Sequence, residues 1–257
     1  GFVRDMFMAA ALGTGPVADA FFVAFRFPNL FRRLFAEGAF NSAFVPMFAG
    51  RLEQGGHPVA RGFAERALST MLAFLLGLTI LCEIVMPLLI MVFAPGFIDD
   101  VAKFDLTVLL TAITFPYLLF VALTALSGGI LNSFHRFALP ALTPVILNLC
   151  LIAGALWLSP HLEVPIMALG WAILAAGILQ LLVQFPALRR LDLLPRPRWG
   201  WRHSGVQKIL RLMVPTLFGS SVAQINLLLD TLIASFLITG SQTWLAQSDR
   251  LLEFPLG

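Results

Sequence analysis

The sequence has 257 residues, of which 59% are hydrophobic and only 12% are charged. Soluble domains carry about 25% charged residues, so this chain has too little charge to cover a globular surface. The composition therefore predicts a polytopic membrane protein and excludes a disordered chain, a disulfide framework and a nucleic-acid-binding protein. The net charge of +3 fits this class, because the basic residues gather in particular loops.

Apolar runs of about 20 residues, the length that crosses a bilayer, divide the chain into a series of predicted membrane helices. Residues 1–12 are too short for a complete span and residues 251–257 end inside another apolar stretch, so we expect a fragment of a longer protein. An eighth helix is expected to start near Ser241. Between the ends we predict six complete spans, at residues 18–49, 62–93, 104–134, 137–158, 164–188 and 205–238.

The basic residues of the connecting loops predict the orientation of these helices. Eleven Lys and Arg residues fall in the loops at residues 51–66, 132–138 and 189–211, whereas the alternate loops contain only Lys103. Loops rich in Lys and Arg stay in the cytoplasm, so we expect a cytoplasmic N-terminus and a cytoplasmic connection at residues 189–204.

Several charged residues lie inside the predicted spans, where each costs about 2.5–3.5 kcal/mol if it faces lipid. One face of the predicted helix at residues 18–49 carries Arg26, Asn29, Arg33 and Glu37. Arg33 can form an ion pair with Glu37, four residues later on this face. Asp249, Arg250 and Glu253 open the eighth helix. Such groups either pair to hold helices together or line a hydrated cavity, and the pattern leaves both interpretations open.

Arg32 favours the second interpretation, because its own helix offers it no carboxylate three or four residues away. A guanidinium stays charged when partly desolvated and donates paired hydrogen bonds to phosphate. Arg4 and Arg250 belong to other predicted helices, and we expect them to converge with Arg32 around an anionic, phosphorylated cargo.

Uncharged polar residues and one carboxylate complete the polar groups of the spans. Asp230 lies mid-span near Asn226 and Thr231, whose oxygens suit a sodium ion or a proton, although a hydrogen-bonded helix clamp explains them equally well. Asn148, Gln180, Gln184 and Gln224 favour contacts between helices over cargo binding. No zinc-ligand spacing, nucleophile elbow or phosphate-binding loop appears, so we predict no catalytic residue.

Five segments carry a family resemblance that covers the whole chain. They are GFVRD at residues 1–5, DAFFVAFR at 19–26, PNLFRRLFAEGAF at 28–40, PALTP at 140–144 and DRLLEFP at 249–255. Together they resemble the MurJ (MviN) family of lipid II flippases, within the multidrug/oligosaccharidyl-lipid/polysaccharide exporter superfamily. One departure is Ala246-Gln247-Ser248, where many relatives carry a tyrosine-rich stretch.

The resemblance implies an all-α transmembrane bundle that forms the N-terminal part of a roughly fourteen-helix, two-lobe transporter. Residues 1–188 would form the N-terminal lobe, residues 189–204 the cytoplasmic linker, and residues 205–257 the start of the C-terminal lobe. The implied protein is no enzyme. It lies in the bacterial inner membrane and moves undecaprenyl-pyrophosphate-linked peptidoglycan precursor, lipid II, from the cytoplasmic to the periplasmic leaflet by alternating access.

The implied partners are lipid II, membrane lipids and the cell-wall synthesis machinery, with no nucleic acid and no cofactor besides a candidate sodium ion at Asp230. By position, the resemblance implies cavity roles for Arg4, Asp5, Asp19, Arg32 and Arg250. The other polar groups predicted to bind substrate are Arg26, Arg33, Asn148, Asp249 and Glu253.

Two other functional classes remain open at this point. A related exporter of another lipid-linked glycan or of drugs would share the fold and the charged cavity. A membrane enzyme acting on polyprenyl phosphates would need a catalytic acid or a metal cluster, which the sequence does not offer. A structural scaffold gives no reason for arginines inside the spans.

Overall fold

The computed structural model describes residues 4, 7–8, 15–33, 40–193, 198, 200 and 203–253, and all but the side chains of residues 40–41, 216–218, 220–223 and 250–253. In these residues the regular structure is helical, without strands, which confirms the predicted all-α class. The main helices are α2 (Pro16–Phe31), α3 (Phe40–Ile84), α4 (Met86–Phe93), α5 (Val101–Thr114), α6 (Tyr117–Ser133), α7 (Ala138–Ala153), α8 (Met167–Arg190), α9 (Ser204–Ser235) and α10 (Ser241–Glu253).

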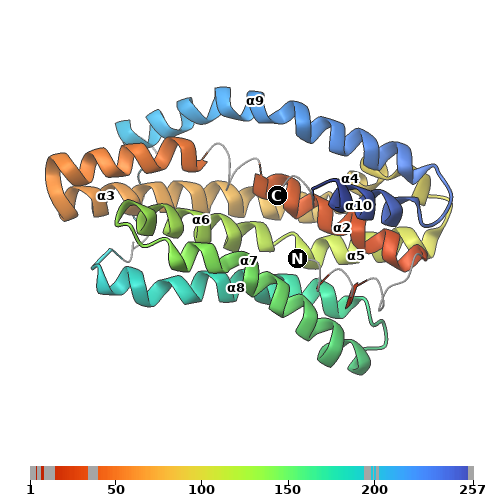
Figure 1. Ribbon diagram of the computed structural model, residues 1–257. Coiled ribbons are helices and arrows are strands. Elements are labelled where there is room, and N and C mark those ends of the chain that lie inside the picture. Colours follow the sequence, from red (N-terminus) through yellow and green to blue (C-terminus); the bar gives the residue numbers. More distant parts are fainter. Residues whose placement is uncertain are drawn as a thin grey trace.

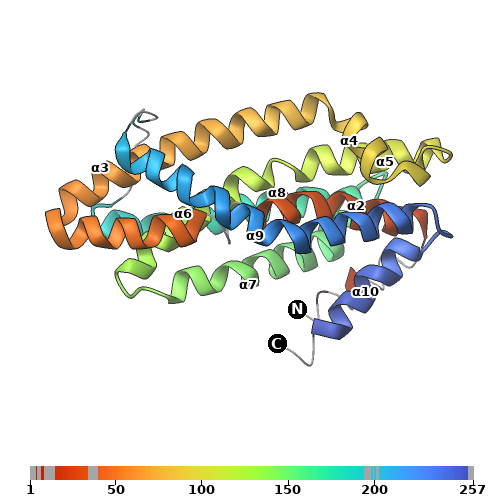
Figure 2. The same ribbon diagram turned by 90° about the horizontal axis from the view of Figure 1, so that it is seen from above.

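The long helices run lengthwise through an elongated bundle (Figure 1). Helix α6 packs between α3 and α8, α7 packs on α8, and α2 packs on α5. Helix α9 lies along α3, and α10 turns back from its end to contact α2 (Figure 2). Three clusters of buried apolar side chains fill the bundle, each drawn from several of these helices.

The segment between the predicted spans at residues 18–49 and 62–93 differs from the sequence prediction. Within the predicted helix at residues 18–49, α2 ends at Phe31 and residues from Phe40 onward belong to α3, while residues 34–39 lie outside the described part of the chain. The predicted loop at residues 51–66 is helical, so α3 reaches Ile84 with one sharp kink. Gly56 makes this kink at φ +65°, a conformation that a residue without a Cβ adopts at little cost.

Hydroxyl groups compensate for two prolines inside helices. Proline has no N–H, so the carbonyl four residues before it loses its usual donor. For Pro28 that carbonyl belongs to Ala24, and the Thr114 hydroxyl of α5 lies 3.4 Å from it, sharing its hydrogen with the Leu110 carbonyl at 2.9 Å. For Pro144 it belongs to Pro140, and the Thr143 hydroxyl donates to it at 2.8 Å. Both prolines are therefore tolerated within apolar helices.

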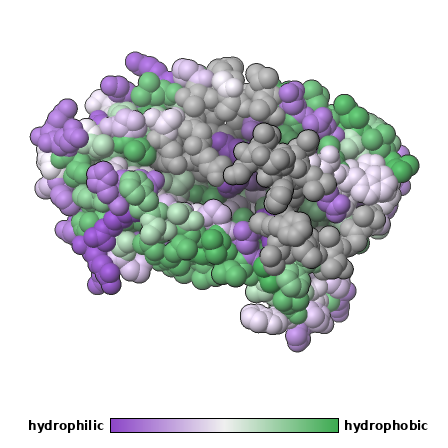
Figure 3. Space-filling model, in the orientation of Figure 1, coloured by the Kyte–Doolittle hydropathy of each residue, from purple (hydrophilic) through white to green (hydrophobic). Residues whose placement is uncertain are grey.

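The described residues contain four helical segments that are long and apolar enough to cross a membrane: Ser42–Ile84, Val101–Ser133, Ala138–His161 and Met167–Arg190. They correspond to four of the six predicted spans, with α5 and α6 joined into one around Pro116. Apolar side chains cover much of the visible flank, and hydrophilic residues gather at the end where α3 turns (Figure 3). The chain is a multi-pass membrane protein.

Candidate functional site

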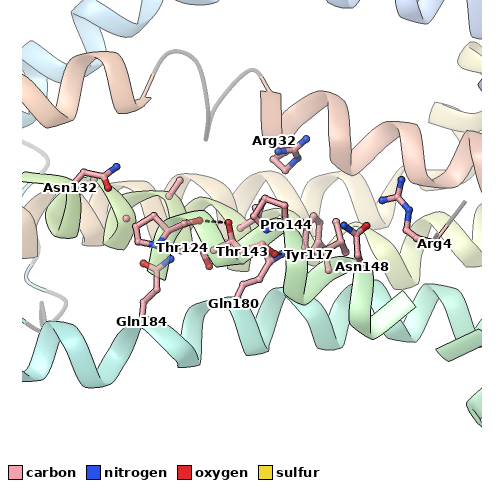
Figure 4. Close-up of a pocket in the computed structure, with 16 residues that line it drawn as sticks. Arg4, Arg32, Tyr117, Thr124, Asn132, Thr143, Pro144, Asn148, Gln180 and Gln184 are labelled. Atoms are coloured by element: carbon pink, nitrogen blue, oxygen red, sulfur yellow. Dashed lines mark hydrogen bonds between the residues drawn. The ribbon is translucent and has the colours of Figure 1, made fainter. Parts of the chain in front are cut away.

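A polar cavity of about 400 Å³ lies among α6, α7 and α8. That volume is at the lower end of the range for ligand pockets. Arg32, directly after α2, and Arg4, near the N-terminus, both reach the cavity although they are far from its helices in sequence (Figure 4). Its other polar lining residues are Tyr117, Thr124, Asn132, Thr143, Asn148, Gln180 and Gln184.

Glycines let the helices around this cavity approach one another closely. A Cβ on Gly177 of α8 would lie 2.7 Å from Tyr117 Cδ2, so a larger residue there would displace the Tyr117 ring. A Cβ on Gly128 of α6 would lie 3.5 Å from Pro140 of α7 and 4.0 Å from the Gln184 side-chain oxygen. Close packing of α6 against both neighbours therefore fixes the positions of the polar side chains that line the cavity.

The Arg32 guanidinium is oriented by Asn29 on the preceding turn. Its Nε and Nη2 atoms both donate to the Asn29 side-chain oxygen, at 3.0 and 2.7 Å. Asn29 is neutral, so these two hydrogen bonds orient the planar guanidinium but bring no opposite charge to it. Figure 4 shows Arg32 and Arg4 extending toward the cavity from separate segments. Two guanidinium groups near one polar volume favour an anion, because each can donate several hydrogen bonds to it.

Two glutamines of α8 form the wall opposite the arginines. The Gln180 side-chain nitrogen donates to the Thr143 carbonyl of α7 at 2.8 Å, so Gln180 partly acts as the predicted contact between helices. Its oxygen, and both the oxygen and the nitrogen of the Gln184 amide, have no hydrogen-bond partner among the described residues. These side chains are 2% and 1% exposed, so their unpartnered atoms are deeply buried.

Asp19 lies in a different environment, between α2, α5 and α10. Its carboxylate accepts hydrogen bonds from the Gly240 N–H, the Thr243 N–H and the Thr243 hydroxyl, at 2.7, 3.0 and 2.8 Å. The Lys103 ammonium of α5 completes the shell at 3.1 Å. Asp19 therefore caps the N-terminus of α10 and is not among the residues that line the cavity.

Arg26 also joins helices. Its Nη1 donates to the Thr231 hydroxyl of α9 at 2.6 Å and to the Gln242 side-chain oxygen of α10 at 3.1 Å. Its Nη2 is buried without a hydrogen-bond partner among the described residues. Asp249 and Asp230 are near enough to act on its charge. Arg26 thus links α2 to α9 and α10, and it is not among the residues that line the cavity.

Asp230 is exposed and borders a second, shallower hollow between α9 and α10, beside Ser241 and Ser248. The Thr231 hydroxyl, expected to help hold a cation, instead accepts from Arg26 and donates to the Leu227 carbonyl. Hard cations take about six or more oxygen ligands, so one carboxylate and two hydroxyls do not complete a site. No cluster of three His, Cys, Asp or Glu residues suited to a metal occurs in the part of the chain that the structure describes.

Comparisons with known proteins agree with this architecture. The family model for lipid II flippase MurJ matches residues 8–257. The chain belongs to the MurJ family. The chain is 47% identical to a probable lipid II flippase MurJ of Haemophilus influenzae and 44% identical to the lipid II flippase MurJ of Burkholderia cenocepacia, over 100% and 99% of its length.

A solved MurJ structure in an inward closed conformation superposes with a TM-score of 0.78 at 29% identity, covering 98% of this chain and 52% of that one. The chain spans about half the length of the curated MurJ relatives that it matches, 52% of the Haemophilus influenzae protein and 50% of the Burkholderia cenocepacia protein. The bundle described above therefore corresponds to about half of the larger MurJ fold.

The MurJ bundle brings together some of the predicted substrate ligands and separates others. Arg4, Arg32 and Asn148 line the cavity, whereas Asp19, Arg26, Arg33 and Asp249 are not among its lining residues. Asp5 and the side chains of Arg250 and Glu253 lie outside the described residues. The division into lobes at residues 188 and 204 stays a prediction.

Several polar residues of the MurJ cavity had no predicted role in a site. Tyr117, Thr124 and Asn132 recur on α6 at a spacing that keeps them on one helix face, and this spacing is visible in the sequence. Gln184 was interpreted as a contact between helices, but its amide makes no hydrogen bond to a described residue. The sequence of one helix does not show that these residues line a cavity, because the cavity depends on which helix lies opposite.

Proposed function

We propose that the full-length protein moves lipid II from the cytoplasmic to the periplasmic leaflet of the inner membrane. The observation that carries this proposal is that Arg4 and Arg32, from separate segments, line one polar cavity inside an apolar bundle. A pyrophosphate cannot enter hydrocarbon unaided, because its charge loses its hydration. Guanidinium groups replace that hydration with charge-assisted hydrogen bonds, while the prenyl chain stays in lipid.

The proposed mechanism is alternating access. Arg32, held by Asn29, and Arg4 would bind the pyrophosphate, and the two lobes of the complete transporter would rock around it. The links from Asp19 and Arg26 to α9 and α10 are positioned to change during such a motion, because they join the predicted lobes. Binding and release change no covalent bond, so the cavity needs no catalytic residue.

The proposed orientation places the N-terminus in the cytoplasm. Arg51, Arg61 and Arg66 of the kinked part of α3 lie on the strongly basic side of the predicted topology, and Lys103 lies on the other. Contact with the cell-wall synthesis machinery belongs to the same proposal, since the cargo is a peptidoglycan precursor. A sodium ion at Asp230 remains a proposal that requires further ligands from helices beyond this chain.

The test is a leaflet-resolved assay in which an external enzyme cleaves only the lipid II that has reached the outer leaflet. We expect Arg32→Ala in the full-length protein to reduce lipid II binding about 10- to 100-fold, the effect of losing about 1.5–3 kcal/mol of charged hydrogen bonds, and to stop export. The matched control is Arg136→Ala, which removes an exposed arginine from the turn before α7.

Normal export by the Arg32→Ala protein would contradict the cargo role of this arginine. Equal binding of lipid II and of unrelated lipid-linked glycans or drugs by the unsubstituted protein would favour the related-exporter alternative. That alternative has the same fold, so only a comparison of ligands separates the two.

A further inference from the structure

Gln184 carries a complete hydrogen-bonding group without a partner at the cavity wall. The side chain is 1% exposed, and neither its nitrogen nor its oxygen has a hydrogen-bond partner among the described residues. Gln180, one helical turn earlier on the same face of α8, leaves its oxygen unpartnered as well. The two residues thus present one donor nitrogen and two acceptor oxygens within a single turn.

A purely structural role does not account for this arrangement. Buried polar groups in folded proteins are nearly always hydrogen-bonded, because an unmade bond costs the full desolvation of the group. Gln180 satisfies its nitrogen on the Thr143 carbonyl, but Gln184 makes no comparable link between helices. Gly128 of α6 lies beside the Gln184 oxygen, since a Cβ on this glycine would make an ordinary contact with that atom at 4.0 Å.

The amide groups of Gln180 and Gln184 determine which ligand groups can make the missing hydrogen bonds. An amide both donates and accepts, and it carries no charge, so it matches hydroxyl and acetamido groups. Phosphate and carboxylate groups are better served by the arginines of the same cavity. A neutral sugar joined to a pyrophosphate would place both kinds of group in one ligand.

We propose that Gln184, assisted by Gln180, forms a saccharide subsite that binds hydroxyl and acetamido groups of the sugar next to the arginine-bound pyrophosphate. This inference rests on the proposed lipid II transport and adds to it the part of the headgroup that α8 recognises. Water occupies the same positions when no ligand is bound, because a polar cavity of this size holds ordered water. The sugar displaces that water and reproduces its hydrogen bonds.

The test compares three lipids on the purified full-length protein: lipid II, its analogue without the pentapeptide, and undecaprenyl pyrophosphate without a sugar. We expect Gln184→Leu to weaken binding of the first two about tenfold, which corresponds to about 1.4 kcal/mol, and to change the third by less than about twofold. Thermal stability should stay equal or rise, because an apolar group of similar shape replaces unpartnered polar atoms.

The matched control is Gln224→Leu, which makes the same change at a buried glutamine of α9 that also has an unpartnered oxygen but does not line the cavity. Gln184→Met serves as a second variant if Gln184→Leu folds poorly. Equal losses for all three lipids, or no loss for any, overturn the saccharide subsite, and so does a loss confined to lipid II with its pentapeptide. Failure of the unsubstituted protein to bind lipid II overturns the proposed function together with this inference.

Discussion

Two polar clusters inside the same apolar bundle differ in how completely their hydrogen bonds are made. The Asp19 carboxylate accepts hydrogen bonds from two backbone N–H groups and a hydroxyl, and it forms an ion pair with the Lys103 ammonium. At the cavity wall, Gln184 is equally buried but has no partner for its amide among the described residues. Burial alone therefore does not separate structural from binding groups.

Incomplete hydrogen bonding indicates a binding group only where the side chain also lines a cavity, since Arg26 and Gln224 also have atoms without a partner among the described residues but do not line it. A satisfied buried network stabilises one arrangement of helices and resists exchange with a ligand. At a polar wall that no other helix bonds, water or a ligand makes the missing hydrogen bonds, and a ligand with matching groups can replace the water. Asp19 fits the first description and Gln184 the second.

The largest expected effect tests the first cluster. Asp19→Ala should lower the free energy of unfolding by about 3–5 kcal/mol, because it leaves the buried Lys103 charge and two N–H groups of the α10 N-terminus without an acceptor. Thermal unfolding of the purified protein measures the loss. Asp99→Ala, which removes an exposed carboxylate on the same side of the bundle, is the control and should change little. A small effect at Asp19 would contradict its structural role and leave it a candidate cargo ligand.

A smaller effect is expected at the helix contact that supports the cavity. Gly177→Ala should destabilise the protein by about 1–3 kcal/mol and displace the Tyr117 ring, since the added Cβ would lie 2.7 Å from Cδ2. The control is Gly77→Ala in α3, where nothing lies within 4 Å of the added Cβ and helix propensity favours alanine by up to about 1 kcal/mol. Changes of opposite sign in the free energy of unfolding would support the close contact between α6 and α8, whereas equal changes would contradict it.

The smallest expected effect concerns pH at the start of α9, outside the membrane-spanning segments. Burial and the nearby Arg66 and Arg51 charges lower the pKa of His203 from its usual 6.5. Its Nδ1 accepts from the Gly205 N–H at 3.2 Å, which needs an unprotonated nitrogen. Because the folded state binds this proton less readily than the unfolded state, stability should be complete above about pH 6.5 and fall as pH drops toward the lower, folded pKa.

Hydrogen exchange at the N-terminus of α9, compared at neutral and mildly acidic pH, measures this loss. His203→Asn keeps a side chain that can cap the helix but removes the titration, so its exchange should not change in the same way between the two pH values. An identical pH response in both proteins would show that another group is responsible.

The sequence predicted the helical class, four of the observed spans and the MurJ family, because each depends on local composition or on contiguous motifs. It predicted a connection over all of residues 51–66, whereas these residues are helical except at Gly56, where the chain reverses between two helical parts of α3 (Figure 1). It grouped Asp19 with the candidate cargo ligands on position alone. The partners that satisfy Asp19 lie in α5 and at the start of α10, 224 residues away for Thr243, and no local pattern reveals them.

Composition by itself determined that this chain enters a membrane, because the free energy of insertion is set segment by segment by the side chains that each helix carries. The packing of the helices sets which of the buried polar groups are hydrogen-bonded by other helices and which face a shared cavity. Arg32 and Gln184 meet the same volume from helices that are distant in sequence, whereas Arg26, on the same helix as Asn29, turns to α9 and α10. A hydrogen bond depends on the distance between two atoms, and that distance is set by how the helices pack.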